Sequence, residues 1–161
     1  MKKLGALWVM SLLLLVGCNN DDDGGDEEPQ ISYDEQLEID TGIIDDYLSD
    51  NNIQADIHES GLRYVINEQG EGDTPTGGSV VIAAYEGRFF DGSVFDRAST
   101  AEFRLTGVIP GWQIGLPLIQ SGGSITLYIP SGLGYGTNGN PLGEIGPNTN
   151  LIFDVRILGV D

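Results

Sequence analysis

The sequence predicts an α+β fold in which one antiparallel sheet is combined with one short helix. The chain has 24 glycines in 161 residues, about twice the usual share, which is typical of a β structure rich in turns. Beyond residue 60, short β-forming runs alternate with glycine turns, and one helical stretch interrupts them. This length allows a single compact domain with extensions.

Residues 1–17 are predicted to be a signal peptide. A basic start precedes an apolar run over 4–16, which is too short for a membrane span of about 20 residues. The run ends in Leu-Val-Gly-Cys, which resembles the lipobox of bacterial lipoproteins. Cys18, the single cysteine, would then be the lipidated first residue of the mature protein. An ordinary secretory signal with an incidental cysteine is the alternative.

Residues 18–30 are predicted to form an acidic tether, because their charges repel one another and nothing in them can be buried. An acidic run just after a lipidated cysteine resembles the surface-export signal of lipoproteins in Bacteroidetes-type bacteria. We expect a palmitate-bearing lipoprotein of the outer membrane, on its periplasmic or its cell-surface face. Calcium binding by Asp21, Asp22 and Asp23 is the alternative, but EF-hand spacing is absent from the sequence.

Residues 31–59 are predicted to form an N-terminal helical appendage. Ser32 and Glu35 have the spacing of a capping box, and Gly42 indicates a broken helix or two short ones. We favour an appendage that packs on the main domain over a dimerisation helix. The apolar positions recur at helical spacing: Leu37, Ile44, Tyr47 and Leu48.

Residues 60–161 are predicted to form the sheet domain. The run 88–95 forms two arms around a hairpin turn at Asp91 and Gly92. A helix over 112–120 is opened by Pro110, and Pro117 inside it should end or kink the helix. The predicted strands are 62–66, 79–85, 88–95, 101–105, 124–129 and 151–160.

The charge balance excludes several classes of function. The 25 acidic and 7 basic residues give a net charge of −18, and loss of Lys2 and Lys3 with the signal peptide leaves five arginines and a net charge of −20. Such a polyanion does not bind nucleic acid electrostatically. One cysteine and one histidine exclude a disulfide framework and metal sites rich in these residues, and they leave little for a nucleophilic triad. We expect no nucleic-acid partner, no metal and no cofactor.

Linked motifs over residues 60–161 resemble those of the FKBP-type peptidyl-prolyl cis-trans isomerases, in the family's order and nearly its spacing. Together they identify 60–161 as an isomerase domain of this type. The resemblance implies a bent antiparallel sheet wrapped around the short helix. The motifs are Tyr85-Glu86-Gly87, Val94-Phe95-Asp96, GVIPGW at 107–112, Gly115-Leu116, Gly122-Gly123, IPSGLGYG at 129–136 and Leu151–Val155.

The resemblance also implies a binding pocket. Trp112 would form its floor, and Tyr135 and the backbone N–H of Ile109 would donate hydrogen bonds to the carbonyls of a bound peptide. Asp96 would be a polar wall that holds Tyr85 in place. The implied catalytic residues are Tyr85, Asp96 and Tyr135, and the implied substrate-binding residues are Phe95, Phe103, Val108, Ile109, Trp112, Ile145 and Phe153.

The activity implied is rotation about X–Pro peptide bonds in proline-containing polypeptides, here exported proteins. Such a bond rotates over a barrier of about 20 kcal/mol that amide resonance maintains. An aromatic, water-poor pocket favours the twisted, less polar transition state, so no nucleophile or metal is required. Macrolides directed at this family are expected ligands. The alternative is a peptide-binding or chaperone module that keeps the fold without catalysis.

The sequence departs from the family pattern around the pocket rim. The segment 96–103 is shorter than is usual, and Asn140 and Glu144 stand where a histidine and an apolar residue are common. These changes leave the pocket floor intact, so we expect the pocket to persist with an altered peptide preference.

Overall fold

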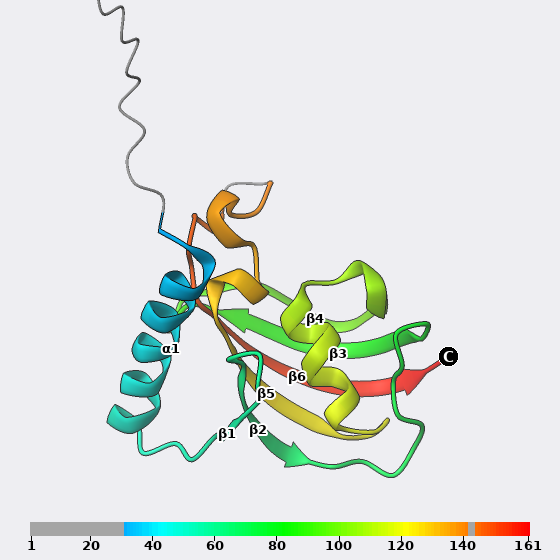
Figure 1. Ribbon diagram of the computed structural model, residues 1–161. Helices are drawn as coiled ribbons and strands as arrows, with labels where there is room; N and C mark the ends of the chain where they lie inside the picture. The colour runs from blue at the N-terminus through cyan, green and yellow to red at the C-terminus, as the bar shows by residue number, and fades with distance from the viewer. Residues whose placement is uncertain (1–30, 142–143) are drawn as a thin grey trace, which may run out of the picture. The chain divides into compact units, whose positions relative to one another are not determined.

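The structure, a computed structural model, describes residues 31–141 and 144–161. The predicted signal peptide, Cys18 and the acidic tether lie outside the described residues. An antiparallel sheet of six strands forms the centre, in the order β1-β2-β5-β6-β3-β4 (Figure 1). In chain order the strands are β1 (Asp56–Ile57), β2 (Arg63–Glu68), β3 (Val80–Arg88), β4 (Val94–Arg104), β5 (Ser124–Ile129) and β6 (Leu151–Val160).

The β3–β4 hairpin forms one edge of this sheet. Its turn lies at Asp91 and Gly92, as predicted, and Gly92 has a φ of +87°, which glycine adopts without strain. The hairpin predicted over 88–95 consists of the end of β3, the turn and the first residues of β4. The strand predicted at 101–105 continues the same strand β4, so the shortened segment 96–103 is extended backbone. Register shifts in the β3–β4 ladder interrupt its pairing, and such bulges bend a strand.

The helix on the pocket side is shorter than the prediction over 112–120. Helix α2 begins at Pro110 and ends at Gly115, and a 3-10 turn, η2, follows it over Leu116–Leu118. Pro117 accounts for the early end, because proline has no N–H to continue the α-helical hydrogen bonds. Three further 3-10 turns are η1 (Leu105–Gly107), η3 (Ser131–Leu133) and η4 (Gly136–Asn138).

The N-terminal helix α1 is continuous over Tyr33–Asp50. Its first turn has the predicted capping box, in which the Glu35 N–H donates to the Ser32 hydroxyl and the Glu35 carboxylate accepts from the Ser32 N–H. Gly42 does not break the helix, because it lies on the exposed face, where its missing side chain leaves no gap. Among the described residues, no helix combines the length and apolar character needed to cross a bilayer.

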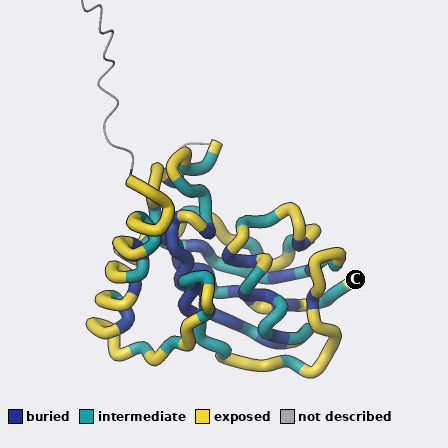
Figure 2. The backbone as a smooth tube through the Cα atoms, in the orientation of Figure 1, coloured by how far each residue is buried: buried dark blue, intermediate teal, exposed yellow. Residues whose placement is uncertain are grey.

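The two faces of the sheet carry two separate apolar clusters. Alternate residues of β5 show this, because Ile125 and Leu127 belong to the main core with α2, whereas Tyr128 points to the opposite face and packs with Ile44 and Leu48 of α1. Figure 2 shows the buried strands between more exposed segments. Residues 31–161 form one compact unit, and β1 pairs with β2, so the segment 31–59 is packed on the sheet that follows it.

Candidate active site

Aromatic side chains from three strands and α2 converge above the concave face of the sheet. Trp112, at the start of α2, is 4% exposed. Its ring centroid lies 5.4 Å from those of Tyr85 and Phe103 and 5.3 Å from that of Phe153, in edge-to-face geometry. Phe95 continues the cluster, 5.4 Å from Phe153. Edge-to-face contacts of this kind stabilise an aromatic wall beyond its buried area alone, so the floor is rigid.

These rings line a cavity of about 450 Å³, within the range of small-molecule sites, roughly 300–1,000 Å³. All ten residues that the family resemblance placed in the pocket lie on it. Sequence reasoning did not include Gly107, Asn140 and Glu144 among the site residues, although it marked the last two as departures at the rim. The lining is Tyr85, Phe95, Asp96, Phe103, Gly107, Val108, Ile109, Trp112, Tyr135, Asn140, Glu144, Ile145 and Phe153.

Tyr85 and Asp96 form a polar pair on neighbouring strands. The Tyr85 hydroxyl donates to Asp96 Oδ2 across 2.7 Å. Desolvation, followed by this hydrogen bond and the charge of Asp96, raises the pKa of Tyr85 to about 12. The hydroxyl therefore stays protonated at neutral pH and fixes the direction of the carboxylate at the cavity wall.

Gly87 allows the aromatic wall to approach the backbone of β3. A Cβ at this position would lie 2.6 Å from Phe95 Cζ and 2.7 Å from Phe153 Cε1. No side chain fits there unless both rings move. The Tyr85-Glu86-Gly87 motif thus has a packing explanation: its glycine allows two pocket rings to lie directly on the strand.

Hydrogen-bond donors of the cavity lining without an acceptor among the described residues include the hydroxyl of Tyr135 and the backbone N–H of Ile109. Burial, and then the negative charge of Asp96, raises the pKa of Tyr135, so its hydroxyl also remains a donor. The buried Nε1–H of Trp112 is likewise unpaired within the described residues. Unpaired donors in an aromatic cavity suit a ligand that brings carbonyl oxygens.

The charged groups at the rim are acidic. Asp96 and Glu144 line the cavity, and none of its described lining residues is cationic. In residues 31–141 and 144–161, no three His, Cys, Asp or Glu side chains gather into a possible metal site. The cavity offers aromatic surface and hydrogen-bonding groups, which can desolvate and hold a bound ligand.

Comparison with known proteins agrees with the family resemblance of the sequence. The family model described as FKBP-type peptidyl-prolyl cis-trans isomerase matches residues 72–158. The chain is 46% identical over 105 residues to the probable FKBP-type peptidyl-prolyl cis-trans isomerase FkpA of Neisseria meningitidis, covering 63% of this chain and 38% of that protein. It is 42% identical over 105 residues to the peptidyl-prolyl cis-trans isomerase Mip of Coxiella burnetii, covering 63% of this chain and 45% of that protein.

Solved structures show the same similarity. The crystal structure of FkpA from Escherichia coli superposes with a TM-score of 0.69 at 35% identity, covering 80% of this chain and 62% of that one. The chain spans less than half the length of the curated relatives described above. The sequence similarity therefore concerns only part of those proteins.

Proposed function

Because the chain belongs to the FKBP-type peptidyl-prolyl cis-trans isomerases, we propose that it accelerates cis-trans rotation about X–Pro bonds in proline-containing polypeptides. The observation that carries this proposal is the aromatic cavity on the Trp112 floor. The hydroxyl of Tyr135 and the N–H of Ile109 at its wall have no acceptor within the part of the chain that the structure describes. Macrolides directed at this family are proposed as competing ligands of the same cavity.

The geometry supports catalysis by a change of environment. In water, the planar amide is stabilised by solvation of its polar carbonyl, and the twisted transition state is less polar. Transfer into a cavity walled by aromatic rings removes that solvation and lowers the barrier to rotation. A thousandfold acceleration would require about 4 kcal/mol of preferential transition-state stabilisation. Tyr135 and Ile109 would hold the neighbouring carbonyls, and Asp96, fixed by Tyr85, would form the polar wall.

The test is isomerisation of a proline tetrapeptide by the mature chain, residues 18–161. The wild-type protein should accelerate cis-to-trans exchange, and Tyr135→Ala or Asp96→Ala should abolish most of this acceleration. A rate equal to the uncatalysed rate at micromolar protein would refute the proposal. If the peptide then still changed Trp112 fluorescence, the cavity would be a binding site without turnover.

We also propose that the mature protein is anchored through a lipid at Cys18, in the outer membrane and with exported proteins as clients. The support is the leader pattern that ends at the single cysteine. Cells fed labelled palmitate should incorporate it into this protein, and Cys18→Ser should eliminate the label and release the protein from the membrane fraction. Labelling that persists in Cys18→Ser would contradict the anchor.

A further inference from the structure

Asp40 is a buried carboxylate on α1 that the proposed mechanism does not use. It is 1% exposed, and its Oδ2 accepts hydrogen bonds from the backbone N–H and the hydroxyl of Ser131, at 2.8 and 2.6 Å. Oδ1 accepts from the Gln36 side-chain amide at 2.8 Å. Asn150 joins the group, because its Oδ1 accepts from the same Ser131 N–H at 3.0 Å. A buried carboxylate is costly unless it is hydrogen-bonded, so these contacts strongly favour one arrangement of helix and loop.

Ser131 begins the loop that carries Tyr135 to the cavity. The chain between them is tightly turned: the Leu133 N–H donates to the Pro130 carbonyl and the Gly134 N–H donates to the Ser131 carbonyl, each at 2.9 Å. Tyr135 follows directly after this pair of turns. The position of Ser131 therefore sets the position of Tyr135, because these hydrogen-bonded turns fix the segment between them.

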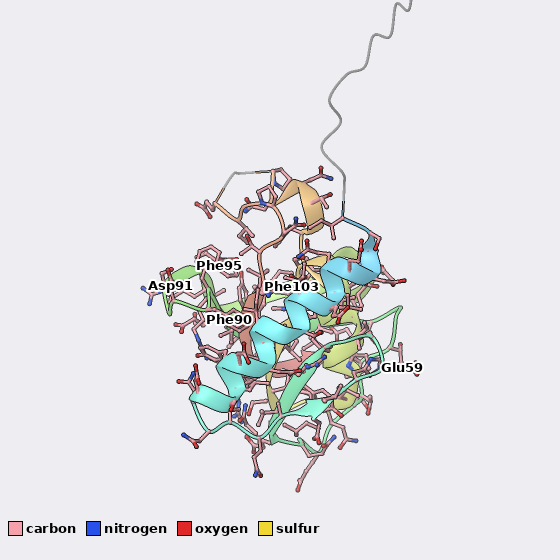
Figure 3. All side chains as sticks on the ribbon, turned by 60° about the vertical axis from the view of Figure 1, so that its left-hand side comes forward. Glu59, Phe90, Asp91, Phe95 and Phe103 are labelled. Carbon is pink, nitrogen blue, oxygen red and sulfur yellow. The ribbon has the colours of Figure 1, made fainter. Side chains whose placement is uncertain are left out.

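Helix α1 also contacts the β3–β4 hairpin, whose strands supply residues of the cavity lining. The Tyr47 ring packs edge-on against Phe90 of the β3–β4 hairpin, with centroids 4.8 Å apart, and Figure 3 shows Phe90 beside α1. The neighbouring Phe89 lies 4.9 Å from Phe95, which lines the cavity. One helix thus contacts both the loop that carries Tyr135 and the hairpin whose strand β4 supplies Phe95 to the cavity.

We propose that Asp40 is a positioning residue for the active site: through this carboxylate, α1 holds the loop that presents Tyr135. The functional unit then includes α1, which lies outside the matched segment 72–158. The kinetic part of the test rests on the proposed isomerase function, whereas the structural part does not.

The experiment compares variants of the mature chain with a control on the same helix. Asp40→Ala removes the carboxylate, and Ser131→Ala removes only the hydroxyl donor, which is the milder change if Asp40→Ala fails to fold. Asp45→Asn is the control, because Asp45 binds Arg63 of β2 at 2.7 and 2.9 Å. It attaches the helix to the sheet without touching the loop.

The kinetic measurement is kcat/KM for a proline tetrapeptide, at a temperature where each variant is folded. Asp40→Ala should lose about tenfold, as expected when a substrate-positioning group is displaced, and Asp45→Asn should lose little. In a Tyr135→Phe background, Asp40→Ala should add little further loss, because both changes affect one contact. Equal losses in Asp40→Ala and Asp45→Asn, or full additivity with Tyr135→Phe, would overturn the proposal.

The structural measurement is amide hydrogen exchange of Leu133 and Gly134, whose hydrogen bonds form the turns before Tyr135. Exchange should become at least several-fold faster in Asp40→Ala and Ser131→Ala and stay unchanged in Asp45→Asn. Unchanged exchange in the first two variants would overturn the proposal. If the wild-type protein failed to isomerise the peptide, the proposed function would fail, and exchange alone would decide whether Asp40 holds the loop.

Discussion

The hydroxyl of Tyr85 is the most strongly perturbed titrating group of the cavity. Its pKa of about 12 lies above the ordinary value of 10 because burial and Asp96 both disfavour the phenolate. Between these two values, the unfolded chain has lost this proton and the folded chain keeps it. The contribution of this proton to the free energy of unfolding is complete below pH 10 and is lost as the pH rises toward 12.

We therefore predict that the free energy of unfolding of the wild-type protein falls between pH 10 and pH 12. Tyr85→Phe has no phenol to titrate at this position, so its stability should fall less steeply over the same interval. Urea denaturation at stepped pH measures both slopes. Parallel slopes would show that Tyr85 titrates alike in the folded and unfolded chains.

Gly87 gives a second prediction at the scale of one residue. Gly87→Ala should cost about 1–3 kcal/mol, the usual penalty for overpacking, and it should lower kcat/KM because Phe95 and Phe153 must move. Gly78→Ala is the matched control, since nothing lies within 4 Å of a Cβ there. Thermal unfolding and the peptide assay measure the two effects. Wild-type behaviour of Gly87→Ala would contradict the packing described for the aromatic wall.

At the scale of elements, α1 stabilises the sheet through its buried face. Ile44→Ala should destabilise the protein by about 2–5 kcal/mol, because the side chain is fully buried against the sheet. Ile43→Ala is the control, since Ile43 is the preceding residue of the same helix and is 50% exposed. Chemical denaturation compares the two. Similar, small losses would show that α1 contributes little to stability.

Sequence reasoning located the elements well and their ends less well. The runs of alternating residues mark the strands because side-chain direction alternates along a strand. The helix was predicted over 112–120, with Pro117 expected to end or kink it, and α2 does end at Gly115, because Pro117 lacks the N–H that would continue the α-helix. Helix α1 was predicted to be interrupted at Gly42. It is continuous instead, because its opposite face packs on the sheet.

The pocket lining could be predicted because linked motifs carry it, whereas the Asp40–Ser131 contact could not. An aspartate among the acidic residues of an amphipathic helix looks like part of the solvent-facing side. Its partner Ser131 lies 91 positions away. Ser131 belongs to the motif at 129–136, but Asp40 stands in no motif that could have linked the two. Only the packed structure shows that this carboxylate faces the loop.

At the scale of the whole molecule, the acidic charge should select substrates. The chain has 25 acidic residues against 7 basic ones, and Asp96 and Glu144 bring acidic charge to the cavity rim. Tetrapeptides with lysine before proline should therefore be isomerised with a higher kcat/KM than those with glutamate. The difference should shrink as salt is added.

Glu144→Gln provides the control for this prediction, because it removes one rim charge and leaves the other acidic residues of the chain unchanged. The contrast between the two peptides should decrease in this variant. Equal rates for both peptides at low ionic strength would show that the charge does not reach the bound substrate.

The strand order has a consequence for how the protein is made. Strand β6 is the last in sequence, yet it lies between β5 and β3 and pairs with both. These pairings are non-local and costly in chain entropy, and β5 and β3 remain apart until β6 is available. The sheet therefore cannot form completely before β6 has been synthesised. A protein proposed to assist the folding of exported chains must therefore complete its own fold only after residues 151–160 have arrived.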